Sequence, residues 1–182
     1  MLRAAVVQMT STPLDPADNL ARIETWLAHA ADEGARLVVL PECIVTGYFL
    51  SGPEAEAIAE PIPGLRTERL QRACARHGLS AVVGLIERGP DGACYNAAVL
   101  AGPEGILAVY RKTHLLCLGV DRYLKRGERL HPNVSAGGRT EIRARWPRSP
   151  RSRHTSWGGP ARRPGWSNGL AGWAVRRCRR RS

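Results

Sequence analysis

The beginning of the chain combines short apolar runs with one amphipathic stretch. Residues 2–9 are apolar and rich in valine, which is typical of a buried strand. A helix with one apolar face should follow, because apolar residues recur at spacings of three and four positions. These residues are Leu20, Ile23, Leu27 and Ala31. Asp18 is suited to be the N-cap of this helix, and Gly34 is suited to end it.

Further apolar runs predict four more strands and a second helix. Residues 35–42 should form the second strand, so the chain begins with a strand, a helix and a strand, which normally make a right-handed parallel crossover. Residues 66–78 predict the second helix, with Leu65, Leu70 and Cys74 turned inward. Three closely spaced strands follow, separated by turns, at residues 80–88, 94–102 and 106–112. This order predicts an α/β fold with a mixed sheet.

The composition divides the chain near residue 130. Residues 1–130 contain 14 Lys and Arg against 15 Asp and Glu, a net charge of −1, whereas residues 131–182 contain 13 Arg and one acidic residue, a net charge of +12. The formal charge of +11 for the whole chain therefore comes from the second segment. That segment has neither strand nor helix periodicity and holds four of the five Trp among Arg, Gly, Pro and Ser, which predicts disorder.

The second segment also has the composition of a GC-rich coding region translated in the wrong frame. It is rich in Arg, Gly, Pro, Ser and Trp, while Lys, Asp, Phe, Ile and Tyr nearly vanish. We hypothesise a frameshift close to codon 131. As a peptide, the segment would bind polyanions such as nucleic acid only non-specifically, through charge and stacking, because it contains no nucleic-acid-binding motif.

The cysteines favour a reduced, cytoplasmic chain. They are odd in number and widely spaced, with no CxxC pair and no His at metal-ligand spacing. Their positions are Cys43, Cys74, Cys94, Cys117 and Cys178. The N-terminal apolar run is too short for a signal peptide, and no run approaches the roughly 18 residues of a membrane span. We therefore expect no disulfide framework, no zinc site and no contact with a membrane.

Two charged residues follow apolar strands in positions that suit a reaction centre. Glu42 comes directly after the second predicted strand, and Lys112 ends the fifth. In layered α/β folds, ligand sites gather at the ends of strands. Either residue alone would most often be a solvated surface charge. A facing pair could serve as a general base and as a cation that stabilises a developing oxyanion.

Three ordered motifs resemble the carbon-nitrogen hydrolase (nitrilase/amidase) superfamily. They are "LPECIVTGY", "YNAAVLAGPEGILAVYRKTHL" and "GVDRYLKRGERL", preceded by a matching first strand, "RAAVVQM". The resemblance covers residues 1–130, which would be the N-terminal part of the domain. It implies a truncated four-layer α-β-β-α sandwich that assembles into homo-oligomers. It also implies cleavage of small amide or nitrile substrates without a metal or an organic cofactor.

The resemblance assigns roles to individual residues. Glu42 matches the general base of a Cys-Glu-Lys mechanism, and Lys112 matches the lysine that stabilises the tetrahedral intermediate. Asp121 lies near the position of a second glutamate that helps to hold the lysine, but its side chain is shorter by one methylene. His114 matches a common residue of the family, for which a structural role is the better interpretation.

The nucleophilic cysteine of this mechanism is missing. In the family it follows the lysine by roughly 30 to 40 residues, on a strand-to-helix turn that exposes the thiolate. This sequence has no cysteine between Cys117 and Cys178. Cys117 belongs to the loop of the lysine, Cys178 lies inside "RRCRRR" without a preceding strand, and Cys43 is interpreted as a packing residue. We therefore expect the chain as written to be inactive or nearly so.

Three interpretations of the whole chain stay open. The first is a hydrolase, acting on amides rather than nitriles, whose nucleophile is restored in another reading frame. The second is a noncatalytic remnant that binds polyanions through residues 131–182. The third is a product without function. In each case a half sandwich would expose apolar faces and sheet edges, which predicts oligomerisation or poor solubility.

Overall fold

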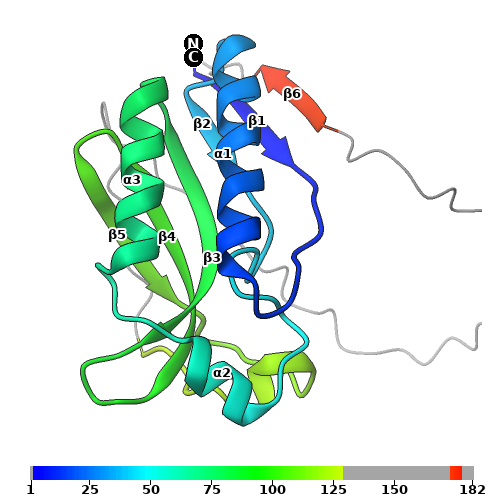
Figure 1. The fold of residues 1–182 in the computed structure, drawn as a ribbon, viewed down its shortest axis with the longest axis vertical. Helices are drawn as coiled ribbons and strands as arrows, with labels where there is room; N and C mark the ends of the chain where they lie inside the picture. The colour runs from blue at the N-terminus through cyan, green and yellow to red at the C-terminus, as the bar shows by residue number, and fades with distance from the viewer. Residues whose placement is uncertain (1, 129–172, 178–182) are drawn as a thin grey trace, which may run out of the picture.

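A computed structural model describes residues 2–128 and 173–177 of the chain. Its strands form one mixed sheet in the order β5-β4-β3-β2-β1-β6 (Figure 1). The strands are β1 (Arg3–Val7), β2 (Leu37–Val39), β3 (Ser80–Arg88), β4 (Cys94–Gly102), β5 (Gly105–Arg111) and β6 (Trp173–Arg177). β1, β2 and β3 are parallel neighbours, β4 is antiparallel to both β3 and β5, and β6 is antiparallel to β1. β5 therefore points the same way as β2, so both strands end at the same edge of the sheet.

Two long helices cover one face of the sheet (Figure 1). α1 (Pro16–Asp32) lies between β1 and β2 in the chain, and α3 (Leu65–His77) lies between β2 and β3, as the predicted parallel crossovers require. Each buried Leu or Ile of the core beneath them contributes about 1.5–3 kcal/mol. The helix residues of that core include Leu20, Ile23, Leu27, Leu70 and Cys74. The predicted α/β fold with a mixed sheet is thus confirmed.

Both helices begin differently from what the sequence predicts. The N-cap of α1 is Asp15 and not Asp18, because the Asp15 carboxylate accepts a hydrogen bond from the Asp18 backbone N–H at 3.0 Å. Pro16 then occupies the first turn, where its fixed φ suits a helix and its missing N–H leaves no hydrogen bond unmade. Leu65, predicted to turn inward, is 80% exposed. The start of α3 extends beyond the core, and Thr67 is the first buried residue of the helix.

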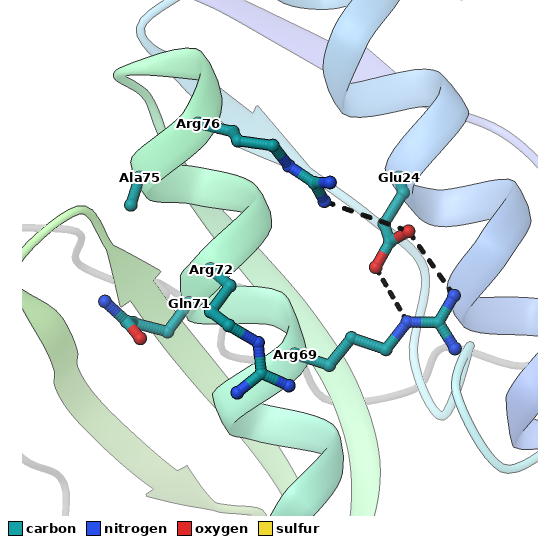
Figure 2. A pocket seen from close by; sticks show the side chains of 6 residues that line it. All are labelled: Glu24, Arg69, Gln71, Arg72, Ala75 and Arg76. Atoms are coloured by element: carbon teal, nitrogen blue, oxygen red, sulfur yellow. Dashed lines mark hydrogen bonds and ion pairs between the residues drawn. The ribbon is translucent and has the colours of Figure 1, made fainter.

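A carboxylate of α1 ties the two helices together. Glu24 Oε1 accepts a hydrogen bond from Arg69 Nε at 2.7 Å, and Arg76 Nη2 lies 4.0 Å from Glu24 Oε2 (Figure 2). A groove at this place is lined by these three residues together with Gln71, Arg72 and Ala75. Partly exposed ion pairs of this kind contribute about 1 kcal/mol or less. The lining holds no thiol, hydroxyl or imidazole group, and its ion pairs link α1 to α3.

The other face of the sheet carries a row of apolar side chains. Val6, Val39, Val82 and Leu100 pair in register across four adjacent strands. Side chains alternate along a strand, and the immediate neighbours of these four residues belong to the core under the helices, so the row faces the opposite way. Val6 is 52% exposed, and the other three are half-buried. A face of this character normally packs against a further layer.

Three elements have no counterpart in the predicted pattern. α2 (Gly52–Ile58) and the 3-10 helix η1 (Gly119–Tyr123) are too short to show a helical period in the sequence. β6 lies in the segment for which the sequence predicts disorder. Residues 129–172 and 178–182 lie outside the described residues, so the disorder and the polyanion binding of that segment stay predictions. No helix of the described residues has the length and apolarity to cross a membrane.

Candidate active site

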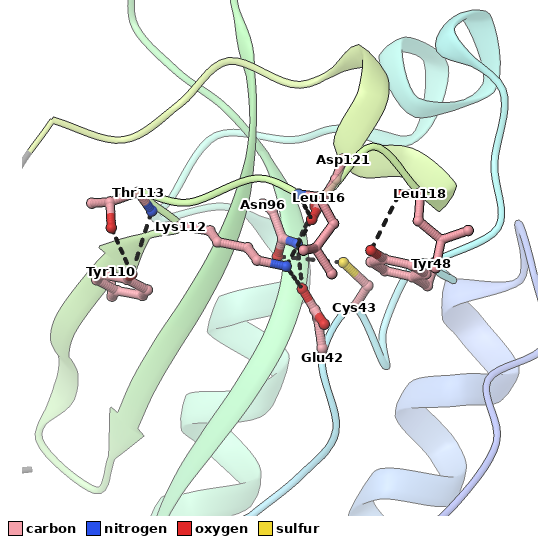
Figure 3. A network of polar contacts seen from close by, with 10 residues as sticks. All are labelled: Glu42, Cys43, Tyr48, Asn96, Tyr110, Lys112, Thr113, Leu116, Leu118 and Asp121. Carbon is pink, nitrogen blue, oxygen red and sulfur yellow. Dashed lines mark hydrogen bonds and ion pairs between the residues drawn. The ribbon is translucent and has the colours of Figure 1, made fainter. Parts of the chain in front are cut away.

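Residues from four segments meet at the edge of the sheet where β2 and β5 end. Glu42 lies in the turn that follows β2, and Lys112 directly follows β5. β4 runs the opposite way, so its first residues, including Asn96, begin at this edge. η1 adds Asp121. Figure 3 shows the four side chains pointing toward one another.

Lys112 bridges two carboxylates. Its Nζ donates a hydrogen bond to Glu42 Oε1 at 2.7 Å and another to Asp121 Oδ2 at 2.7 Å. The three side chains differ in exposure: Asp121 is 0% exposed, Lys112 is 22% exposed and Glu42 is 46% exposed. The buried aspartate therefore anchors the lysine, while the glutamate is open to solvent.

Asn96 connects the same two carboxylates through its side-chain amide. Nδ2 donates to Glu42 Oε1 at 2.7 Å and to Asp121 Oδ1 at 2.8 Å, and the residue is only 4% exposed. Glu42, Lys112, Asp121 and Asn96 thus form a closed ring of hydrogen bonds, called the four-residue ring below. Sequence reasoning missed Asn96. The available signal was a single amide within the apolar run "CYNAAVLAG", because a buried polar side chain must find partners.

The ring keeps its central charges in place. Burial works to raise the pKa of Asp121, but hydrogen bonds from Lys112, Asn96 and the Leu116 backbone N–H outweigh it, so this pKa lies below its ordinary value of 3.8. Burial likewise works to lower the pKa of Lys112, but its bonds to Asp121 and Glu42 hold that pKa well above 10.5. Near neutral pH the lysine is therefore a fixed cation beside a solvent-facing carboxylate. Such a pair can accept a proton and stabilise a developing negative charge.

Gly84 of β3 lets the backbone of Glu42 lie close to the sheet. A Cβ on residue 84 would overlap the backbone nitrogen of Cys43 and would lie 2.9 Å from Glu42 Cα. The same turn is tied to β3 by a hydrogen bond from the Val45 N–H to the Gly84 carbonyl at 3.2 Å. Glycine at this position is therefore a condition for the placement of Glu42.

The backbone of Lys112 is held on both sides. Its N–H donates to the Asn96 carbonyl at 2.8 Å, and its own carbonyl accepts a hydrogen bond from the Gly127 N–H at 2.9 Å. A Cβ on residue 127 would overlap the carbonyl oxygen of Arg111, so only glycine allows this approach. The segment after η1 therefore helps to fix the lysine.

Cys43 adjoins Glu42 but is enclosed by the protein. It is 0% exposed and has a φ of 47°, which is uncommon for a residue other than glycine. Its Sγ donates a hydrogen bond to Asn96 Oδ1 at 3.5 Å. Burial, helped by the charges of Glu42 and Asp121 and opposed by Lys112, raises the pKa of the thiol to about 12. A thiol in this state is protonated at neutral pH, in agreement with a packing role.

The other residues singled out in the sequence lie outside the four-residue ring. Cys117 is exposed in the loop between Lys112 and η1. Cys178 lies outside the described residues, but β6 ends directly before it at Arg177, so the expectation that no strand precedes this cysteine is wrong. His114 is exposed, and its Nδ1 lies 3.0 Å from Thr113 Oγ1. In the part of the chain that the structure describes, no group of three or more His, Cys, Asp or Glu residues could hold a metal ion.

The chain matches known protein sequences over most of its length. A family model described as carbon-nitrogen hydrolase matches residues 3–144, a range that runs past the boundary near residue 130. A nitrilase from Pyrococcus abyssi is 40% identical over 117 residues, which cover 63% of this chain and 44% of that protein. The omega-amidase NIT2 of Danio rerio is 37% identical over 140 residues, covering 73% of this chain and 48% of that protein. The chain therefore spans about half the length of these curated relatives.

Solved structures resemble the chain in the same way. The NitN amidase from Neterenkonia sp. AN1 matches with a TM-score of 0.61 and 30% sequence identity, over 76% of this chain and 54% of that one. Another structure, of the amidase from Nesterenkonia sp. AN1, shows acrylamide joined to its active-site cysteine by Michael addition. The α/β fold is thus of the nitrilase type. With the family model matched over residues 3–144, this chain belongs to the carbon-nitrogen hydrolase family.

Proposed function

We propose that the four-residue ring is the base-and-lysine part of a centre that hydrolyses small amides. Glu42 is the general base, Lys112 stabilises the oxyanion that forms when the amide carbon is attacked, and Asp121 holds the lysine. Nitriles are the second substrate class, since the relatives include a nitrilase as well as omega-amidases. Amides come first because the solved structures that match this fold include an amidase at 30% sequence identity.

The bridged position of Lys112 carries this proposal. Its Nζ lies 2.7 Å from both Glu42 Oε1 and Asp121 Oδ2, so two carboxylates hold the ammonium beside the proposed base. A cation fixed before the reaction needs no reorganisation when negative charge develops on the substrate oxygen. A positioned general base typically contributes a factor of about 10²–10⁴ to the rate.

We propose further that the chain as written does not complete this reaction. The covalent route needs a thiolate next to Glu42 and Lys112, as in the amidase whose active-site cysteine carries acrylamide. Here Cys43 is buried and protonated, and the sequence has no cysteine between Cys117 and Cys178. Among the residues that the structure describes, no reactive thiol therefore lies beside the base and the lysine.

The test compares the chain as written with a frame-corrected chain. The coding DNA is translated in the two other frames downstream of codon 131, and a frame that supplies a strand followed by a cysteine is joined to residues 1–130. Ammonia release is then measured on short aliphatic amides and nitriles. We expect no release from the chain as written and release from the corrected chain. If neither of the two alternative frames contains such a cysteine, the frameshift hypothesis is refuted.

Variants of the corrected chain test the assigned roles. Glu42→Gln and Lys112→Met should each lower kcat by about 10²-fold or more, because each removes a group that acts on the transition state. Lys125→Met is the matched control, since this lysine pairs with Asp91 on the surface, with an Nζ to Oδ2 distance of 2.7 Å, and does not touch the four-residue ring. Hydrolysis that survives Lys112→Met would contradict the proposal.

A further inference from the structure

We propose that Asn96 is the positioning residue that decides which carboxylate of the site can take a proton. Its side-chain amide donates a hydrogen bond to one oxygen of Glu42 and to one oxygen of Asp121. Glu42 Oε2 then remains without a donor and is the basic oxygen, whereas both oxygens of Asp121 have donors. The inference rests on the proposed role of Glu42 as the base. It goes beyond that role because it names the oxygen and the residue that selects it.

The orientation of the Asn96 amide follows from its three neighbours. The thiol of Cys43, with its Sγ 3.5 Å from Asn96 Oδ1, donates to that oxygen in this orientation. The two carboxylates, at 2.7 and 2.8 Å from Nδ2, can only accept. A flipped amide would place its oxygen against two negatively charged carboxylates and would leave both of them without this donor. The chemistry therefore fixes the NH₂ group toward Glu42 and Asp121.

Counting donors on each carboxylate oxygen separates the two acids. Asp121 Oδ1 accepts from Asn96, and Asp121 Oδ2 accepts from both Lys112 and the Leu116 N–H at 3.1 Å. Glu42 Oε1 accepts from both Lys112 and Asn96. Among the described residues, no side chain or backbone group donates to Glu42 Oε2, and 46% of the side chain is exposed. A proton can therefore reach Oε2 without displacing any existing donor.

Removing the Asn96 donor would reduce the difference between Glu42 and Asp121 in their ability to accept a proton. Lys112 alone would then hold Glu42 Oε1, and Asp121 Oδ1 would be a buried oxygen without a donor. Leucine has nearly the same shape as asparagine and cannot donate, so Asn96→Leu removes the hydrogen bonds with little change in volume. Asn19→Leu is the matched control, because Asn19 is buried like Asn96 and, among the described residues, its Nδ2 donates only to the carbonyls of Thr12 and Val45.

The first measurement is the free energy of unfolding of the full chain between about pH 3 and pH 7. Both variants should lose stability at neutral pH. Asn96→Leu should also flatten the acid limb of the profile, because the Asp121 carboxylate loses a donor that keeps it charged. Asn19→Leu should keep the slope of the unmodified chain. An unchanged acid slope in Asn96→Leu would overturn the proposal.

Other titratable groups around Asp121 do not confuse this test. The groups that face it come from the residue after β5, from the turn after β2 and from the loop that follows that turn: Lys112, Cys43, Glu42 and Tyr48. The pKa values of Lys112, Cys43 and Tyr48 are all raised, so these groups keep their protons throughout the acid range. Glu42 is the remaining carboxylate and also loses the Asn96 donor in Asn96→Leu, so the comparison is repeated in a Glu42→Ala background, where only Asp121 can respond.

The second measurement needs no Asn96 variant. In the ¹H–¹⁵N spectrum of the labelled full chain, the two Nδ2 protons of Asn96 should give separate signals, each shifted by a different carboxylate. Glu42→Ala should return one of them to the position of a solvated amide and leave the other in place, while the Asn19 pair stays unchanged. An Asn96 pair that does not respond to Glu42→Ala would refute the contact. Failure of the hydrolysis assay alone would count against the proposed function and not against this contact.

Discussion

Lys112 Nζ lies 2.7 Å from Glu42 Oε1, although 70 residues separate the two positions in the chain. The contact exists because β2 and β5 point the same way and end at one edge of the sheet. Asp121, buried on the other side of the lysine, prevents the ammonium from leaving this edge. The pair therefore depends on the order of the strands and on one buried carboxylate.

The two carboxylates should respond differently to amide substitution. Asp121→Asn places an NH₂ group against at least one of the donors Lys112, Asn96 and the Leu116 N–H, and should cost about 3 kcal/mol or more. Glu42→Gln keeps one oxygen for both of its donors and turns its NH₂ group to solvent, so it should cost less than about 1 kcal/mol. Urea denaturation of both variants at neutral pH measures the difference. Equal losses of unfolding free energy in the two variants would contradict the different roles of the two carboxylates.

Stability should decline at both ends of the pH range for opposite reasons. The folded pKa of Asp121 is below 3.8, so its contribution is present above that pH and is lost as the pH falls through the folded value. The folded pKa of Lys112 is above 10.5, so its contribution is present below that pH and is lost as the pH rises through the folded value. Denaturation at stepped pH values should show a plateau between about pH 4 and pH 10. In Asp121→Asn the acid decline should be smaller.

Gly84→Ala should disturb the site although residue 84 contributes no side chain to it. The new Cβ would overlap the backbone of Cys43 and crowd Glu42 Cα, which should cost about 1–3 kcal/mol and shift the turn after β2. The amide signals of residues 42–47 and of Asn96 should move in the NMR spectrum. Gly52→Ala is the control, since its Cβ would meet only the side chain of Tyr123 at 3.3 Å. If these amide signals do not move in Gly84→Ala, the backbone of the turn after β2 does not lie tightly against Gly84.

Alkylation of the native protein should separate the cysteines by burial. Cys117 is exposed and should react with iodoacetamide at pH 8, whereas Cys43, Cys74 and Cys94 are buried. Burial raises the pKa of Cys43 to about 12 from 9.0, which lowers its thiolate fraction about a thousandfold. Mass spectrometry of the digested protein gives the labelled positions. Rapid labelling of Cys43 would contradict its packing role and would make it a candidate nucleophile.

The apolar row on the face of the sheet opposite α1 and α3 should promote self-association. Val6 is 52% exposed at one end of this row, and Val39, Val82 and Leu100 continue it across the sheet. Size-exclusion chromatography should place the chain above its 19.9 kDa monomer mass, and Val6→Lys should shift it toward the monomer. Leu65→Lys removes an 80% exposed side chain from the helical face and should change nothing. A response to Leu65→Lys alone would place the contact on the helices.

Local patterns in the sequence predicted most of the elements correctly. The spacing of apolar residues places β1, α1, β2, α3 and the three following strands, because that spacing records which side of each element is buried. It fails at element ends: Asp15 caps α1 where Asp18 was expected, and Leu65 is exposed, because capping and burial there depend on single contacts. It also fails for α2 and η1, which are shorter than a readable period.

The candidate site was predictable only in part. The sequence motifs identified Glu42, Lys112 and Asp121, and the fold brings these three side chains into direct contact. Asn96 and Gly84 looked like ordinary strand residues, because their importance comes from segments that are distant in the chain. By itself, the sequence determined the order of the two long helices and of the strands β1 to β5, together with the identity of the charged residues. Only the tertiary structure decided that Asn96 closes the ring and that Glu42 keeps an open oxygen, because hydrogen bonds between distant segments leave no period in the sequence.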